Sequence, residues 1–99
     1  MPRLLETEEV KRQLVEHQRW TVEPETIEGR FSFDGFGQSI KFVTLLADEA
    51  EQMQHHPDID IRYDTVVVTL ATHSEGGVTQ LDVELAIRAD GAAEQVNGG

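Results

Sequence analysis

Three histidines stand where they could carry out acid–base chemistry on a small molecule. His55 and His56 are adjacent in the stretch EQMQHHPDID, and His73 follows a run of apolar and β-branched residues. Histidine titrates near neutral pH, so an imidazole can donate or accept a proton with little free-energy cost. Imidazoles brought together from the ends of two elements could therefore serve as general acid and general base in one cleft.

Two other interpretations of these histidines remain open. They can be ordinary polar residues at element ends, where a histidine also interacts favourably with a helix carboxyl terminus. They can also ligate a metal, because Glu51, Asp58 and Asp60 lie nearby and complete the donor types of a catalytic zinc site. Adjacent histidines seldom reach one ion, and the i, i+4 histidine spacing of helical zinc sites is absent. We therefore expect no metal.

The spacing of apolar residues predicts the elements that precede the histidine pair. Thr7 is the expected cap of a first helix, whose first turn is acidic. Residues 20–22 and 30–33 are rich in aromatic and β-branched residues and predict two strands. From Gln38 the spacing becomes helical, with one apolar stripe for the core made of Ile40, Val43, Ala47, Ala50 and Met53. Pro57 disfavours the helical conformation at the residue before it, so this helix ends at the histidines.

The second half of the chain predicts a hairpin and a last helix. Apolar and polar residues alternate over 59–63, and Val66, Val68 and Leu70 continue on one face of the next segment. This pattern favours two antiparallel strands with one buried face. On this pattern Tyr63 belongs to the core. Thr79 and Asp82 have the spacing of a capping box at the start of the last helix. The tail 91–99 is rich in Gly and Ala, and we expect it to be disordered.

This order of elements predicts the fold class. Helix, two strands, helix, two strands and helix (α-β-β-α-β-β-α) suit an α+β two-layer sandwich. A four-stranded antiparallel sheet would carry about three helices on one face. A length of 99 residues suits one domain over 1–99.

Composition limits the classes of partner. The formal net charge of −11 repels phosphate backbones and anionic lipid surfaces, so we expect no direct nucleic-acid or membrane binding. The chain has no cysteine, which excludes disulfides and thiol catalysis. No apolar run resembles a signal peptide or reaches the ~20 residues of a membrane span. A soluble, cytoplasmic protein is expected.

The chain also resembles a known family. Glu51, His55-His56-Pro57, Tyr63, His73 and Asp82 fall in the order and spacing of the pterin-4a-carbinolamine dehydratase signature. The resemblance covers about residues 4–90. Its further landmarks are Trp20, Phe31-Ser32-Phe33 with Phe36, Phe42-Val43-Thr44, Ala50-Glu51, Thr69-Leu70-Ala71-Thr72-His73 and Leu81-Asp82 with Leu85-Ala86.

The resemblance implies a hydro-lyase, 4a-hydroxytetrahydrobiopterin dehydratase. Its reaction removes water from a 4a-hydroxytetrahydropterin and gives the quinonoid dihydropterin, which recycles the cofactor spent by aromatic amino-acid hydroxylases. The pterin is then the substrate, and no cofactor takes part.

The resemblance also implies roles for individual residues. His55 and His73 become the acid–base pair, and His56 binds and orients the pterin. Asp82 either orients His73 or serves only as the cap. Glu51 supports the cleft or is simply a solvated carboxylate, and Pro57 shapes the turn.

Family members form dimers or tetramers, so a homodimer or homotetramer is expected here. Animal members also act as dimerisation cofactors for a homeodomain transcription factor. The alternative function is therefore a non-catalytic binding module that presents the helix at 40–53 to a partner helix.

Overall fold

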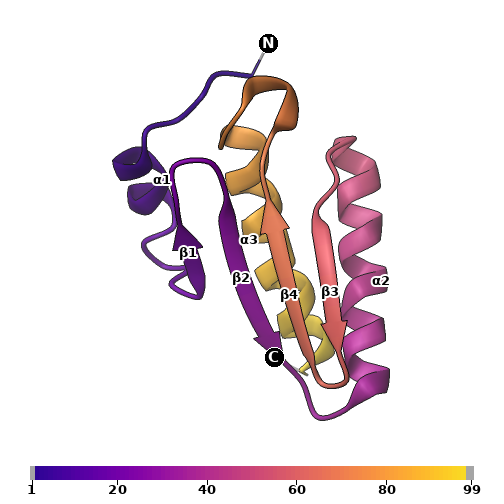
Figure 1. Cartoon of the computed structure of the whole chain (residues 1–99). Coiled ribbons are helices and arrows are strands. Elements are labelled where there is room, and N and C mark those ends of the chain that lie inside the picture. The colour runs from indigo at the N-terminus through magenta and orange to yellow at the C-terminus, as the bar shows by residue number, and fades with distance from the viewer. Residues whose placement is uncertain (1, 98–99) are drawn as a thin grey trace.

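The computed structural model describes residues 2–97, and these form the predicted elements in the predicted order (Figure 1). The only addition is a short 3₁₀ helix before the last α-helix. The elements are α1 (Thr7–Gln13), β1 (Trp20–Val22), β2 (Ile27–Ser32), α2 (Phe36–Met53), β3 (Asp58–Arg62), β4 (Thr65–Leu70), η1 (His73–Glu75) and α3 (Gln80–Val96).

The four strands form one antiparallel sheet in the order β1-β2-β4-β3. The predicted hairpin is β3–β4, and β2 pairs with β4 over its whole length. Side chains alternate across the sheet as period-2 geometry requires. The buried face of the two central strands is apolar, and the opposite face of β2 is exposed. The predicted α+β class and strand count are confirmed.

The helices cover the apolar face of the sheet. In Figure 1, α3 runs behind the strands and α2 stands beside β3; α2 and α3 pack on each other, and α1 lies beside β1. One buried cluster joins all three helices to the sheet, with Phe31 of β2 packed on Phe42 of α2 at 4.5 Å between ring centroids. Within residues 2–97, no helix combines the length and hydropathy that crossing a bilayer requires.

The buried face of α2 is rotated from the predicted stripe. Phe42, Leu46 and Ala50 point into the core, whereas Ile40 and Ala47 of the predicted stripe are exposed. The apolar arc of this helix is wider than the surface that the sheet and α3 can cover. The stripe is therefore only partly core, and its other edge faces solvent.

Three smaller predictions are wrong. Thr7 is the first helical residue and not the cap, because Glu6 takes that position. Tyr63 is 68% exposed, since β3 ends at Arg62 and Tyr63 enters the tight turn to β4 with a positive φ of 53°. The tail expected to be disordered from residue 91 is helical as far as Val96, and residues 98–99 lie outside the described residues.

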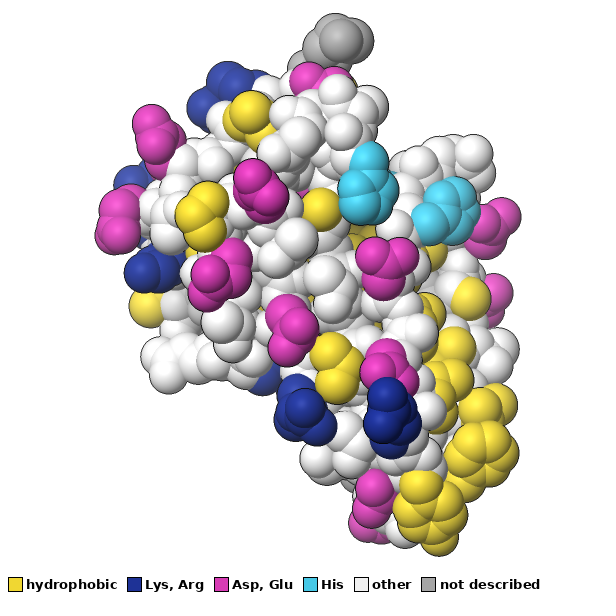
Figure 2. All heavy atoms as spheres, in the orientation of Figure 1, with side chains coloured by type: hydrophobic (Ala, Val, Ile, Leu, Met, Phe, Trp, Pro, Cys, Tyr) yellow, Lys and Arg dark blue, Asp and Glu magenta, His cyan; other side chains and the backbone are white. Residues whose placement is uncertain are grey.

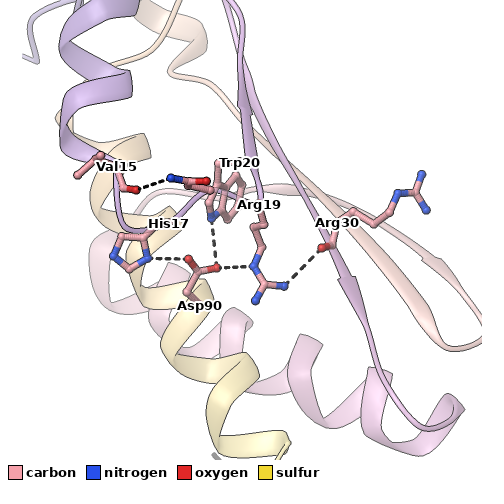
Figure 3. Close-up of polar contacts among 7 residues, drawn as sticks. Val15, His17, Arg19, Trp20, Arg30 and Asp90 are labelled. Carbon is pink, nitrogen blue, oxygen red and sulfur yellow. Dashed lines mark hydrogen bonds and ion pairs between the residues drawn. The ribbon is translucent and has the colours of Figure 1, made fainter.

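Asp90 of α3 holds the segment between α1 and β1 (Figure 3). Its Oδ2 lies 2.7 Å from Nδ1 of His17, and its Oδ1 accepts from Nε of Arg19 at 2.9 Å and Nε1 of Trp20 at 3.2 Å. The guanidinium of Arg19 also lies over the ring of Phe31. These three contacts all come from the short segment 17–20. They fix the start of β1 against α3.

A second polar contact joins α2 to α3. Arg88 donates to Glu49 of α2 at 3.0 Å and to Glu84 of its own helix at 3.1 Å. Hydrogen bonds from the guanidinium to Glu84 and then Glu49 raise the pKa of Arg88 above its ordinary value. The Arg88–Glu49 contact therefore joins α2 to α3 on the solvent side of their packing.

Candidate active site

The end of α2 directs His55 into the protein. Gln54 adopts the left-handed conformation, with φ 52° and ψ 42°, and its N–H reaches the carbonyl of Glu51. The N–H of His55 bonds to the carbonyl of Ala50 at 3.1 Å. This pair of bonds is the Schellman arrangement, which satisfies the last helical carbonyls and reverses the chain. Because the reversal occurs at Gln54, the imidazole of His55 turns inward, and only 10% of its side chain is exposed.

The inward imidazole meets a buried carboxylate. Nε2 of His55 lies 2.6 Å from Oδ1 of Asp82, and the Asp82 side chain is fully buried. Asp82 is positioned by the predicted capping box: its Oδ2 accepts from the backbone N–H of Thr79 at 2.9 Å. The start of α3 therefore places the carboxylate beside the end of α2.

Two threonines complete the surroundings of this carboxylate. Thr72 donates its hydroxyl to Oδ2 of Asp82 at 2.8 Å, and its Oγ1 lies 2.7 Å from Oγ1 of Thr79. Asp82 is thus the predicted cap and also the partner of an imidazole. The predicted partner is wrong, however, because the carboxylate contacts His55 and not His73. The strand end carries Thr72 to the carboxylate, and the next residue turns away into η1.

His73 lies at the start of η1 and is exposed. The loop that carries it is closed by a backbone bond from Thr72 to Gly77 at 2.8 Å, and Gly76 adopts a φ of 76° that favours glycine. His73 lines a hollow of about 370 Å³, whose other lining residues are Glu25, Thr26, Ala71, Gly76 and Gly77. The side chain is therefore available to a bound molecule.

The three histidines occupy one end of the molecule. The end of α2 and the loop after β4 lie together at the top of Figure 1. The pairing of Asp58 with Thr69 links the segment after the histidine pair to the end of β4, and the carboxylate of Asp82 contacts both His55 and Thr72. Figure 2 shows two histidine side chains exposed close to each other at this end.

His56 points away from the buried pair. Its Nε2 lies 2.5 Å from Oε2 of Glu51, and both side chains are more than half exposed. An exposed ion pair adds little to stability. Its value here is orientation, since Glu51 holds the imidazole of His56 at the surface. Pro57 follows with a trans peptide bond and leads directly into β3.

This arrangement can transfer protons. A histidine held by a buried carboxylate is an oriented acid or base, and two more imidazoles lie at the same end of the fold. Among residues 2–97, no three His, Cys, Asp or Glu side chains are grouped closely enough to hold a metal ion.

Sequence reasoning missed Thr72. Thr72 stands next to a predicted site residue, and a β-branched residue at a strand end gives no signal that its hydroxyl is buried against Asp82. Thr79 was visible only as a cap. The pairing of these hydroxyls depends on contacts between β4 and α3 that no local pattern specifies.

Comparisons with known proteins point to one family. The family model described as Pterin 4 alpha carbinolamine dehydratase matches residues 3–92. A curated protein of Sulfolobus acidocaldarius that carries the name of this dehydratase is 44% identical over 82 residues, which span 83% of this chain and 90% of that protein.

Two solved structures are similar to this chain. A crystal structure from Brucella melitensis, described as a transcriptional coactivator/pterin dehydratase, matches with a TM-score of 0.86 and 35% identity, covering 92% of this chain and 99% of that one. A pterin dehydratase-like protein described as a RuBisCO assembly factor of the α-carboxysome matches with a TM-score of 0.62 and 28% identity. That match covers 76% of this chain and 87% of the other.

Proposed function

Because this chain belongs to the pterin 4 alpha carbinolamine dehydratase family, we propose that it dehydrates a 4a-hydroxytetrahydropterin to the quinonoid dihydropterin. The product returns to the tetrahydropterin pool used by an aromatic amino-acid hydroxylase. The single observation that supports the proposal best is the buried His55–Asp82 pair at the end of the fold that also carries His56 and His73.

The reaction requires two proton movements and no change of oxidation state. One proton must reach the 4a hydroxyl, because hydroxide is a poor leaving group, and one must leave a ring nitrogen as the new double bond forms. One imidazole gives a proton and another takes one, so the number of protons on the protein is unchanged. Proton exchange with water then returns each imidazole to its starting state. Positioned acid–base groups of this kind typically contribute about 10²–10⁴-fold to the rate.

The exposure of each residue suggests its role in proton transfer or in substrate binding. His55, held by Asp82, and His73, open to the hollow beside it, form the proposed acid–base pair. His56 and Glu51 stand at the surface, where an oriented imidazole would contact the polar edge of the pterin. Pro57 shapes the turn that separates His55 from His56.

The direct test is the dehydration of a freshly generated 4a-hydroxytetrahydropterin, followed by absorbance with and without purified protein. We expect the protein to accelerate dehydration, with a rate proportional to its concentration and saturation in the pterin. The same protein after heat denaturation serves as the control. A rate equal to that of buffer alone would contradict the proposed activity.

A surface on α2 supports a second candidate function, binding to another protein through a helix face. Phe36 and Ile40 are 52% and 38% exposed, and Figure 2 shows hydrophobic side chains gathered over the α2 side of the molecule. A hollow of about 420 Å³ adjoins them, lined by Ile40, Lys41, Thr44, Leu45, Gln95 and Val96. This surface carries few acidic residues on a chain of net charge −11, so association there avoids most of the repulsion between copies.

We propose that this α2 surface joins copies of the chain into a homo-oligomer. Wild-type protein should then show a mass that is a multiple of 11.1 kDa by light scattering. Ile40→Glu should shift the mass toward one copy without unfolding, since the side chain is already partly exposed. Val15→Glu is the matched control, because Val15 is 61% exposed and lies outside the α2 surface. A wild-type mass of one copy at all concentrations refutes the oligomer.

The substitution His55→Ala distinguishes the two candidate functions. A binding module has no use for the His55–Asp82 pair, so capture of a helical partner should survive His55→Ala. Dehydratase activity should not survive it. If the wild type binds a helical partner through α2 but does not accelerate dehydration, the binding module is the correct function.

A further inference from the structure

We infer that Thr72 is a positioning residue that fixes the tautomer of His55, and that the nitrogen of His55 that exchanges protons with substrate is Nδ1. The inference rests on the proposed function for its catalytic consequence and on the geometry of residues 72–82 for the rest. Thr72, Thr79 and Asp82 are all at least 95% buried, so water does not compete for their hydrogen bonds.

The direction of each hydrogen bond around Asp82 can be assigned. Thr72 has one hydroxyl hydrogen, and it is donated to Oδ2 of Asp82. The 2.7 Å contact between the two hydroxyls must then be a donation from Thr79 to Thr72. Oγ1 of Thr79 in turn accepts the backbone N–H of Leu81 at 3.3 Å. The hydroxyls therefore form a one-way relay that ends on the carboxylate.

The carboxylate of Asp82 decides the tautomer of the imidazole, and the relay acts by holding that carboxylate in place. Oδ2 of Asp82 is occupied by Thr72 and by the N–H of Thr79, and Oδ1 faces Nε2 of His55 at 2.6 Å. A carboxylate that only accepts hydrogen bonds requires a hydrogen on Nε2. In the neutral ring the lone pair is then on Nδ1, so this atom is the one that can take up a proton.

Nδ1 is also the atom that a substrate can reach. It has no hydrogen-bond partner among residues 2–97, and within that part of the chain no buried side-chain nitrogen or oxygen lacks a partner. Nδ1 must therefore lie at the surface of an otherwise buried ring. The carboxylate is on the inner side of the imidazole, and the proton-exchanging nitrogen is on the outer side.

The hydroxyl of Thr72 can be removed without disturbing the loop that carries His73. The loop closes through the backbone of Thr72, whose N–H bonds to Gly77 and whose carbonyl accepts from Glu75 at 3.0 Å. Valine keeps the shape and the backbone bonds of threonine but has no hydrogen to give to Asp82. The carboxylate then loses one of its three donors, and its orientation toward His55 is less fixed.

The test compares Thr72→Val with Thr72→Ser in the full-length chain. We expect Thr72→Val to lower kcat about 10-fold, the effect of one hydrogen bond to a charged group, with KM changed little. Thr72→Ser keeps the hydroxyl and should return kcat to near the wild-type value. If Thr72→Val does not fold, Thr72→Ala removes the same hydroxyl with less bulk.

A second readout is independent of turnover. Nitrogen-15 NMR of the histidine rings, at a pH where they are neutral, should show His55 with hydrogen on Nε2 and a bare Nδ1. Thr72→Val should add a population with hydrogen on Nδ1, and Thr72→Ser should not. Hydrogen on Nδ1 in the wild type, or a folded Thr72→Val with wild-type kcat and tautomer, overturns the inference. A wild type with the expected tautomer but no dehydration refutes the proposed function alone.

Discussion

Replacing His55 or His73 with alanine is expected to lower kcat for carbinolamine dehydration by roughly 10²–10⁴-fold, because each change removes one positioned acid–base group. The imidazole of His55 is held by Asp82, and His73 is exposed and lines a hollow that His55 does not line. The measurement is the steady-state turnover of each variant, after circular dichroism has verified that the variant is folded.

The two substitutions should differ in their effect on stability. His55 is buried, and its loss leaves Oδ1 of Asp82 without its donor, which costs about 1–3 kcal/mol. His73 is exposed, so His73→Ala should change the free energy of unfolding by no more than about 0.5 kcal/mol. His55→Gln is a useful companion, because an amide can still donate to Asp82 but cannot carry a proton between substrate atoms. It should recover stability without recovering turnover.

His17 provides the matched control for these histidines. It too lies against a carboxylate, with 2.7 Å between Nδ1 and Oδ2 of Asp90. Asp90 is eight residues beyond Asp82 on α3, which is about 12 Å along the helix axis. His17→Ala should therefore keep wild-type kcat. Wild-type turnover in both His55→Ala and His73→Ala would remove these two residues from the mechanism.

The histidine site could be anticipated because two local signals, at residues 55–57 and at residue 73, mark the ends of elements that one hairpin joins. Helical spacing ends where Pro57 forbids the helical conformation at its neighbour, and that fixes the pair at a helix terminus. Alternation over β4 places His73 just beyond a strand end. Because β3 and β4 form an antiparallel hairpin, the start of β3 and the end of β4 must lie at the same end of the sheet. Local periodicity therefore sufficed to bring the predicted residues into one region.

The contacts inside that region could not be anticipated in the same way. The distance between Asp82 and His55 depends on how α3 lies against α2, and the sequence separation of 27 residues carries no periodic signal. The family resemblance suggested His73 as the partner of Asp82. In the fold, Thr72 occupies that place, since its side chain and that of the next residue leave the chain in different directions.

The surface of α2 shows another limit of periodicity. The predicted stripe identified an apolar helix correctly but not which part of its arc is covered. Phe42 was outside the stripe and is fully buried, whereas Ile40 was inside it and is exposed. The spacing of apolar residues gives the width of the apolar face of a helix. Which part of that face is buried depends on the elements that pack against it. An excess of apolar width is itself the feature that points to a partner.

Replacing Asp90 with alanine is expected to lower the free energy of unfolding by about 2–4 kcal/mol, the largest stability change among these variants. The carboxylate accepts from Trp20 and Arg19 and pairs with His17, so its loss leaves the buried indole N–H of Trp20 without a partner. For a domain of this size the melting temperature should fall by roughly 10–20 °C. Denaturant titration and thermal melts measure both quantities.

Two variants separate the parts of this contact. Asp90→Asn keeps a carbonyl oxygen for Trp20 and Arg19 but loses the charge, so it should destabilise less than Asp90→Ala. His17→Ala should cost least, because Trp20 and Arg19 still hold the carboxylate. Since Asp90 lies away from the His55–Asp82 pair, every folded variant should retain its kcat. An unchanged melting temperature in Asp90→Ala would show that this carboxylate does not fix β1 to α3. Loss of turnover in a fully folded variant would show that Asp90 is not independent of the active site.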